Sequence, residues 1–336
     1  MILHPGILAL LVGAALSVLM ASYAALLGMR ILKGWDFSSS SASQLQLERR
    51  TYLVSSLMSA ALSFEAVSVL LFLYTVEDIH RLFVGAMCAT GTLNANPVGW
   101  YALGLKVLIF FLALIWITMN RFDQRAGDFP LLRLKYAALL VVAPLLALDL
   151  FLQARFFLGL EPEIITSCCG SLFSSEGGGV AAEISGLPVR MTMTAFFALT
   201  AVTAAAAASA LFSGSRTLRI FLSALSAAWF CISLVSVVSF ISLYVYELPT
   251  HHCPFDIIQK EYRFIGYPLY VSLFAAAGFG MLPGLFVPAR RIPSLLPMIM
   301  SAERSWILVC ILCIIAFTGI VLWYMLSGTF TLEGYL

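Results

Sequence analysis

Apolar residues run along the chain in eight long stretches that are separated by polar connections. A helix needs roughly 20 consecutive apolar residues to cross the hydrocarbon core of a bilayer. The sequence therefore predicts an all-α polytopic membrane protein, a single integral domain over residues 1–336 with eight transmembrane helices. The predicted spans cover residues 6–29, 52–76, 99–120, 136–158, 191–213, 217–245, 265–288 and 306–327.

Composition favours a bilayer environment over a soluble one. Of the 336 residues, 61% are hydrophobic and only 11% are charged, which leaves too few polar residues to cover the surface of a soluble domain. The connections carry no glycine-rich loop of the kind that binds nucleotide phosphates. They also hold no basic cluster large enough to bind nucleic acid. We therefore expect the lipid bilayer as the surroundings and no nucleic-acid partner.

Basic residues fall mainly in alternate connections, and this sets the predicted orientation. One set of connections (30–51, 121–135, 214–219 and 289–305) holds Arg30, Lys33, Arg49, Arg50, Arg121, Arg125, Arg133, Lys135, Arg216, Arg219, Arg290, Arg291 and Arg304. The opposite connections hold only Arg81, Arg155, Arg190, Lys260 and Arg263. Lys and Arg are retained in the cytoplasm, so both termini are predicted outside. The N-terminal MILHPG lacks the basic region of a cleaved signal peptide. Together these features predict a bacterial inner-membrane protein.

Four of the seven cysteines occupy the three longer connections that this topology places on the non-cytoplasmic side. Cys88 lies in connection 77–98, Cys168 and Cys169 in 159–190, and Cys253 in 246–264. Thiols are oxidised routinely on that side of a membrane. A bond between the adjacent Cys168 and Cys169 is strained, because a disulfide prefers Cα atoms more than ~4 Å apart. Cys88 and Cys253 are therefore each expected to pair with one member of the adjacent pair.

Two roles for such bridges remain open. If they only brace the long loops, each stabilises the fold by roughly 2–4 kcal/mol. Alternatively, Cys168 and Cys169 are the shuttle of a thiol–disulfide exchange, with Cys88 and Cys253 as their partners. Exchange needs an accessible thiolate and a second sulfur within reach. Both roles predict that the three outer connections lie close together.

A metal site is a third interpretation of the same connections. His251 and His252 directly precede Cys253, and imidazole and thiolate are ligands suited to copper or zinc. The spacing within any one connection matches no standard zinc pattern. Ligands would therefore have to converge from several connections.

Three ionisable residues interrupt the apolar spans: Glu65, Lys106 and Asp149. A charge at the centre of a bilayer costs at least ~2.5 kcal/mol on insertion scales, so each is a candidate for function. Counted at about 1.5 Å rise per residue, Lys106 and Asp149 lie at comparable depth, and we expect an ion pair between them. Gln153 extends this polar stripe outward, whereas Glu65 has no obvious partner at its depth. The group either fixes the helix register or serves as a proton path or quinone-headgroup site.

The leading hypothesis is a redox-linked integral membrane component. It would exchange electrons between outer-face thiols, or a bound periplasmic redox protein, and the membrane quinone pool, with quinone as its cofactor. The alternative is a non-catalytic permease or anchor subunit that joins other membrane subunits and is braced by structural disulfides. A periplasmic-side copper- or zinc-handling protein is the third hypothesis.

Overall fold

The structure is a computed structural model that describes residues 3–35, 41–161 and 186–332, and the regular elements of these residues are all helices. Eight helical stretches among them are long and apolar enough to cross a membrane. The predicted all-α class and the eight spans are confirmed. The side of the membrane on which each connection lies stays a prediction.

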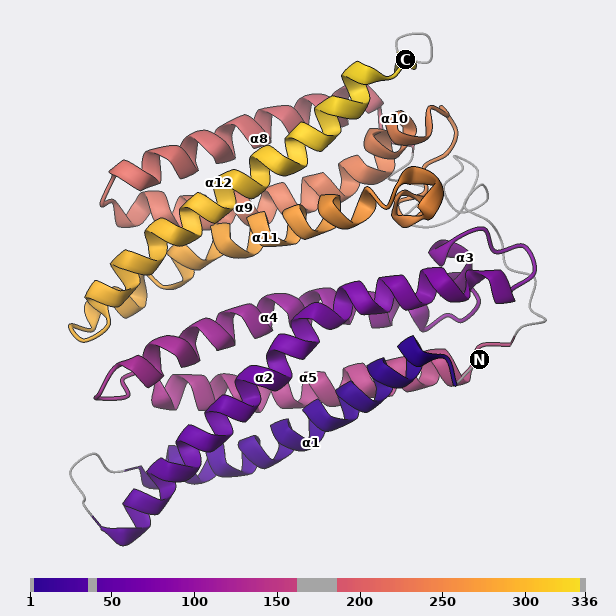
Figure 1. The fold of residues 1–336 in the computed structure, drawn as a ribbon. Helices are drawn as coiled ribbons and strands as arrows, with labels where there is room; N and C mark the ends of the chain where they lie inside the picture. Colours follow the sequence, from indigo (N-terminus) through magenta and orange to yellow (C-terminus); the bar gives the residue numbers. More distant parts are fainter. Residues whose placement is uncertain (1–2, 36–40, 162–185, 333–336) are drawn as a thin grey trace. The chain divides into compact units, whose positions relative to one another are not determined.

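The spanning helices gather in two compact units, each made of four consecutive spans (Figure 1). The bounds in the first unit are α1 Pro5–Gly34, α2 Ala42–Asp78, α4 Gly99–Arg125 and α5 Leu132–Leu158. The bounds in the second are α8 Val189–Phe212, α9 Arg216–Ser236, α11 Gly266–Leu285 and α12 Leu296–Ser327. Residues 79–92 also belong to the second unit. That the whole chain acts as one integral membrane domain stays a prediction.

Both units join their helices in the same cyclic order. In the first unit, α1 and α4 each pack against α2 and α5. In the second, α8 and α11 each pack against α9 and α12. This is the neighbour order of an up-and-down four-helix bundle, which short connections favour. Aromatic side chains help to fill each interior. The ring centroids of Phe72 and Phe156 lie 5.9 Å apart, and those of Trp229 and Phe317 lie 5.4 Å apart.

Two helices begin well before their predicted spans. Helix α2 begins at Ala42 rather than residue 52, and α12 begins at Leu296 rather than residue 306. Hydropathy marks the apolar part of a helix, whereas backbone hydrogen bonding continues into polar sequence. Glu303, which lies inside the predicted connection 289–305, is therefore a buried helical residue.

Helix α11 packs closely against α9 around a proline. Gly280 and Gly284 face α9, and a Cβ on either would come within 2.3 Å of a serine hydroxyl there. Such small-residue spacing lets two helices approach each other in a membrane. Pro283 lies within α11 and lacks an N–H, and Ser223 of α9 bonds the neighbouring backbone. Its hydroxyl donates to the Met281 carbonyl at 2.6 Å and accepts from the Gly284 N–H at 2.8 Å.

The sixth span changes its helical form near one end. Helix α9 continues through a π-helical turn, η2 (Val237–Ile241), into α10 (Ser242–Tyr246). The next residue, Glu247, is left-handed with φ of 53° and ends the helix. The predicted span 217–245 is thus one continuous helical stretch that contains one wider π-helical turn before its last α-helical turn.

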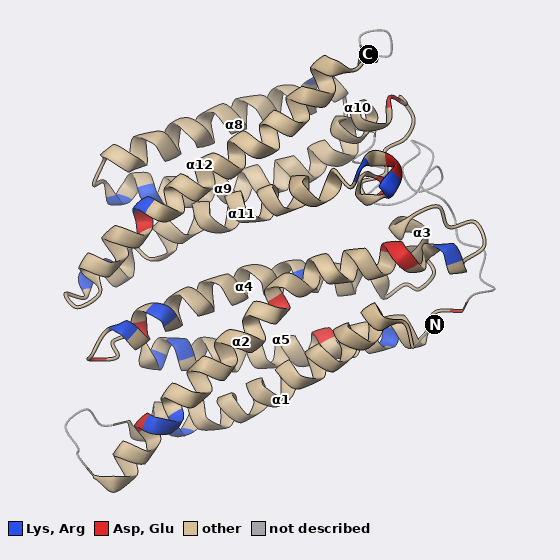
Figure 2. Cartoon of the chain, in the orientation of Figure 1, with Lys and Arg blue, Asp and Glu red and all other residues tan. Residues whose placement is uncertain are grey.

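Charged residues are distributed unevenly along each unit. In Figure 2, Lys and Arg gather at the end of the first unit that carries the α4–α5 connection and at the end of the second that carries the α8–α9 connection. Acidic residues also lie at mid-length of α2 and α5, inside the first unit. This distribution agrees with the alternation of basic connections from which the orientation is predicted.

Candidate functional site

The connection after α10 is held in place by two tyrosine hydroxyls. The Tyr246 hydroxyl donates to the Cys253 carbonyl at 2.6 Å and accepts from the Ile257 N–H at 2.9 Å. The Tyr270 hydroxyl, on α11, donates to the Pro254 carbonyl at 2.5 Å. Two buried side chains thereby fix the backbone at Cys253 and at the residues that follow it, and the Cys253 side chain is buried within the second unit.

Cys88 lies in residues 79–92, which also belong to the second unit, and its side chain approaches that of Cys253. It directly precedes α3 (Ala89–Asn94), and its carbonyl accepts the Gly91 N–H at 3.0 Å. The Gln259 amide donates to the Met87 carbonyl at 2.9 Å, which ties residues 79–92 to the connection after α10. Two connections that are far apart in the sequence are thus joined next to Cys88.

The sulfurs of Cys88 and Cys253 lie 3.4 Å apart. The two side chains are 1% and 0% exposed, and the Thr90 hydroxyl lies 3.5 Å from the Cys253 sulfur. A disulfide joins sulfurs at ~2.05 Å, so small movements of the two side chains suffice to form one. Strain in a Cys168–Cys169 bond pointed instead to pairing of Cys88 and Cys253 with those residues. Cys168 and Cys169 lie outside the described residues, so that pairing and their shuttle role stay predictions.

Asp256 and His251 connect the Cys253 thiol to the surface through two successive hydrogen bonds. The Cys253 thiol donates to Asp256 Oδ1 at 3.3 Å, and His251 Nε2 lies 2.5 Å from Asp256 Oδ2. Burial raises the pKa of Asp256 to about 6, and the hydrogen bond to Asp256 raises the pKa of His251. The His251 side chain is 27% exposed. We call Cys88, Cys253, Asp256 and His251 the cysteine group; it offers a proton path from a buried thiol to an accessible imidazole.

His252 does not join the cysteine group. Its Nδ1 donates to the Val238 carbonyl at 2.9 Å, within the π-helical turn, and burial lowers its pKa. The three candidate ligand atoms that converge come instead from Cys88, Cys253 and Asp256, within 4.8 Å of one another. Of the predicted set His251, His252 and Cys253, only Cys253 is in this convergence, and His251 reaches it through Asp256.

The second candidate site is a buried polar cluster in the first unit. Lys106 Nζ donates to Asp149 Oδ2 at 3.0 Å and to the Ser68 hydroxyl at 2.8 Å. It also lies 3.4 Å from Glu65 Oε2. The Gln153 amide donates to Asp149 Oδ2 at 2.6 Å. We call these five residues the polar cluster.

The polar cluster confirms the ion pair expected between Lys106 and Asp149. The expectation that Glu65 has no partner at its depth was wrong, because its carboxylate and that of Asp149 both contact Lys106. Depth counting missed this contact because it compares backbone positions and does not include the reach of the long lysine side chain. Helices α2, α4 and α5 each supply a part of the cluster.

Sequence reasoning missed three further buried charged groups. Asp256, three positions after Cys253, was not among the predicted site residues. Lys135 and Asp123 form a buried ion pair at 2.6 Å within the first unit. Glu303 binds both Arg219 and Arg290 in the second unit. These charges sit near helix ends, where hydropathy alone assigns them to solvated connections.

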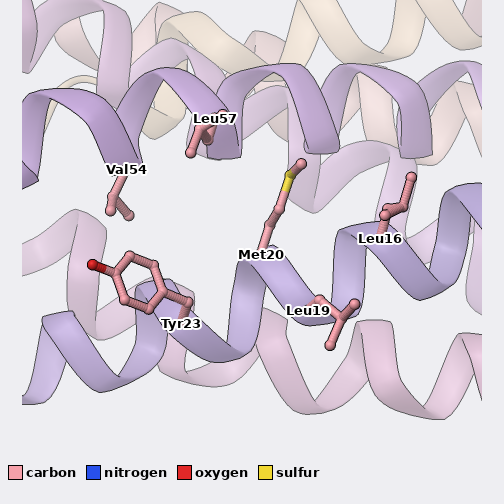
Figure 3. Close-up of a pocket in the computed structure, with 6 residues that line it drawn as sticks. All are labelled: Leu16, Leu19, Met20, Tyr23, Val54 and Leu57. Atoms are coloured by element: carbon pink, nitrogen blue, oxygen red, sulfur yellow. The ribbon is translucent and has the colours of Figure 1, made fainter.

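A shallow apolar groove of about 310 Å³ lies between α1 and α2. Figure 3 shows the residues that line it: Leu16, Leu19, Met20, Tyr23, Val54 and Leu57. Most of these side chains are exposed, as expected for a helix surface that faces lipid tails. The groove contains none of the predicted site residues, so it adds no quinone-binding group to the polar cluster.

Comparison with known proteins found no family model, curated protein or solved structure that matches the chain. Function must therefore be inferred from the cysteine group and the polar cluster themselves.

Proposed function

We propose that the chain is a redox-linked membrane protein in which Cys88 and Cys253 cycle between dithiol and disulfide. It would exchange electrons between thiols of the predicted outer face, or a bound redox partner, and the membrane quinone pool. The observation that carries this proposal is the 3.4 Å approach of two sulfurs from separate connections. Both side chains are buried, whereas exchange needs an accessible thiolate, so the proposal assigns direct exchange with a partner to Cys168 and Cys169.

The chemistry of the proposed step balances with a quinone as the acceptor. Two thiols become one disulfide and release two electrons and two protons, which convert a quinone to a quinol. A partner dithiol then reduces the disulfide through a mixed disulfide and becomes oxidised itself. Asp256 is in contact with the Cys253 thiol and is able to take its proton and pass it to His251. Cys168 and Cys169 keep their proposed role as the shuttle to the partner.

The proposal assigns the cysteine group to the periplasmic side of a bacterial inner membrane. Its support is the run of basic connections at the opposite ends of the spans and the need for an oxidising compartment. Partners would be a periplasmic thiol protein or other membrane subunits. The termini would lie on the same side as the cysteine group.

Loss of either sulfur is expected to abolish thiol-dependent quinone reduction. The full chain, reduced and freed of reductant in lipid nanodiscs, is mixed with a short-chain ubiquinone. Quinol is read by absorbance and thiols by maleimide mass-tagging. The wild type should form one quinol for each disulfide, and Cys88→Ser or Cys253→Ser should form none. Cys231→Ser, an exposed cysteine on α9, is the matched control and should behave as wild type.

The same measurement separates catalysis from bracing. A Cys88–Cys253 disulfide that resists mild reductant and yields no quinol would overturn the redox proposal. It would favour the non-catalytic permease or anchor subunit, whose disulfides only stabilise the outer surface.

A copper- or zinc-handling role is the second candidate, and the convergence of Cys88, Cys253 and Asp256 favours it. Two thiolates and a carboxylate suit these metals. In a tetrahedral zinc site with Zn–S bonds of ~2.3 Å, two sulfurs lie ~3.8 Å apart, not far from the 3.4 Å observed. Cys88, Cys253 and Asp256 would be the ligands, and His251 would orient the carboxylate through its hydrogen bond to Asp256.

Substitution Asp256→Asn is expected to remove bound metal from protein purified under reducing conditions and loaded separately with Zn²⁺ or Cu⁺. The neutral amide is a much weaker ligand than the carboxylate, whereas both sulfurs remain. Metal content is measured by mass spectrometry after gel filtration. Glu261→Gln removes an exposed carboxylate of the same connection and should leave the metal in place. Wild-type protein that retains neither metal stoichiometrically would exclude this second role.

A further inference from the structure

We infer that the polar cluster of the first unit is a proton-binding site that holds one exchangeable proton between the carboxyls of Glu65 and Asp149. This inference goes beyond the redox proposal and rests on different residues in the other unit. It would make the first unit a proton-carrying element of the membrane protein, whatever chemistry the cysteine group performs.

The first support is a charge imbalance. Glu65, Lys106 and Asp149 are each 1% exposed or less. When all three are ionised, two negative charges face one positive charge, and the cluster carries a net charge of −1. A buried unbalanced charge is strongly unfavourable, and more so in a bundle surrounded by lipid. One bound proton makes the cluster neutral.

No neighbouring charge on the four helices is placed to correct the imbalance. Glu65, Lys106 and Asp149 are each the only acidic or basic residue in the central part of their helix, and α1 has none there. The nearest such residues along the helices are His4, which caps the start of α1, Arg30 on α1, Arg50 and Glu77 on α2, Arg121 on α4, and Lys135 and Arg155 on α5. On α2, α4 and α5, all of these except Arg155 lie at least two helical turns from the cluster residue of the same helix. Those of α1 lie toward its ends. The Arg155 side chain is exposed, whereas that of Asp149 is buried.

The second support is a shortage of hydrogen-bond donors. Among the described residues, Glu65 Oε1, Asp149 Oδ1 and Gln153 Oε1 are buried acceptors without a partner. Meanwhile Lys106 Nζ already contacts three oxygens. Buried acceptors left unsatisfied cost free energy. A protonated carboxyl adds an O–H donor, so one proton reduces both the charge imbalance and the donor shortage. A water molecule would supply donors but not charge.

The two carboxyls share Lys106, so the proton belongs to the pair rather than to one residue. Neutralising either carboxyl by substitution should therefore have the same effect. Glu65→Gln leaves Lys106 with Asp149, and Asp149→Asn leaves Lys106 with Glu65. Each variant is balanced without a proton, and the site is lost.

Infrared spectroscopy of the full chain in nanodiscs tests this directly. At neutral pH the wild type should show the carbonyl-stretch band of a protonated carboxylic acid, which shifts down in D₂O as the proton exchanges. Glu65→Gln and Asp149→Asn should each lose that band, so that one folded variant suffices for the comparison. Asp123→Asn is the matched control: Asp123 is also buried, but Lys135 balances its charge one to one. That variant should keep the band, as should Cys88→Ser.

Three outcomes would overturn the inference. The wild type could lack the band, or the band could survive in both carboxyl variants. The band could also emerge only in sodium-free buffer, which would show that a metal cation takes the proton's place. Retention of the band in Cys88→Ser separates this result from any failure of the redox proposal.

Discussion

Replacing Lys106 with methionine is expected to lower the free energy of unfolding by about 3–5 kcal/mol, the range found when one partner of a buried ion pair is removed. Methionine fills much of the same volume but leaves Glu65 and Asp149 facing each other without a cation. It also leaves the Ser68 hydroxyl without its bond to the ammonium group. The loss is measured by titrating SDS into protein in mixed micelles and following tryptophan fluorescence.

The rescue variant identifies the cause. Adding Glu65→Gln and Asp149→Asn to Lys106→Met replaces both carboxylates with neutral amides, and most of the lost stability should return. If the triple variant is as unstable as Lys106→Met alone, lost packing rather than unbalanced charge explains the effect. A Lys106→Met protein as stable as wild type would show that unbalanced charge in the polar cluster costs little free energy, which would count against the charge argument for a bound proton.

The contact between Lys106 and Asp149 could be predicted because apolar spans are long enough to count depth along them. The same count failed for Glu65, because it locates backbone positions along a span and includes neither the reach of the Lys106 side chain nor the tilt of α2. A sequence gives the length of an apolar run but not the tilt of the helix that contains it. Which carboxylates share a cation depends on that tilt and on helix packing.

The cysteine group, too, could be predicted from the sequence only in part. The alternation of basic connections placed Cys88 and Cys253 on one predicted face, but it could not show which sulfurs meet. Their contact depends on tyrosine hydroxyls that bond backbone groups around Cys253 and on the Gln259 bond to Met87. Such side-chain-to-backbone bonds leave no periodic pattern in a sequence. Asp256 was missed for the same reason, since a carboxylate in a connection resembles any solvated acid until the fold buries it.

Substitution Glu303→Gln is the second change with a large expected effect, again about 3–5 kcal/mol of unfolding free energy. Glu303 is 1% exposed and accepts from Arg219 Nε and from Arg290 Nε, each at 2.7 Å. Without its charge, two guanidinium groups would share a buried site with no counter-ion. Arg219 also donates to the carbonyls of Ser213 and Ser215, between α8 and α9, so the damage should extend to that connection.

The matched control is Arg304→Gln, which changes the charge of the adjacent but exposed residue on α12. An exposed charge contributes at most about 1 kcal/mol, so this variant should unfold almost as the wild type does. Both variants are compared in the same SDS titration, and limited proteolysis between α8 and α9 reports on the connection that Arg219 holds. Equal stability of the two variants would mean that water reaches Glu303 and screens it. In that case the ion pairs of Glu303 with Arg219 and Arg290 would be surface interactions and would not hold α9 and α12 together at this end of the bundle.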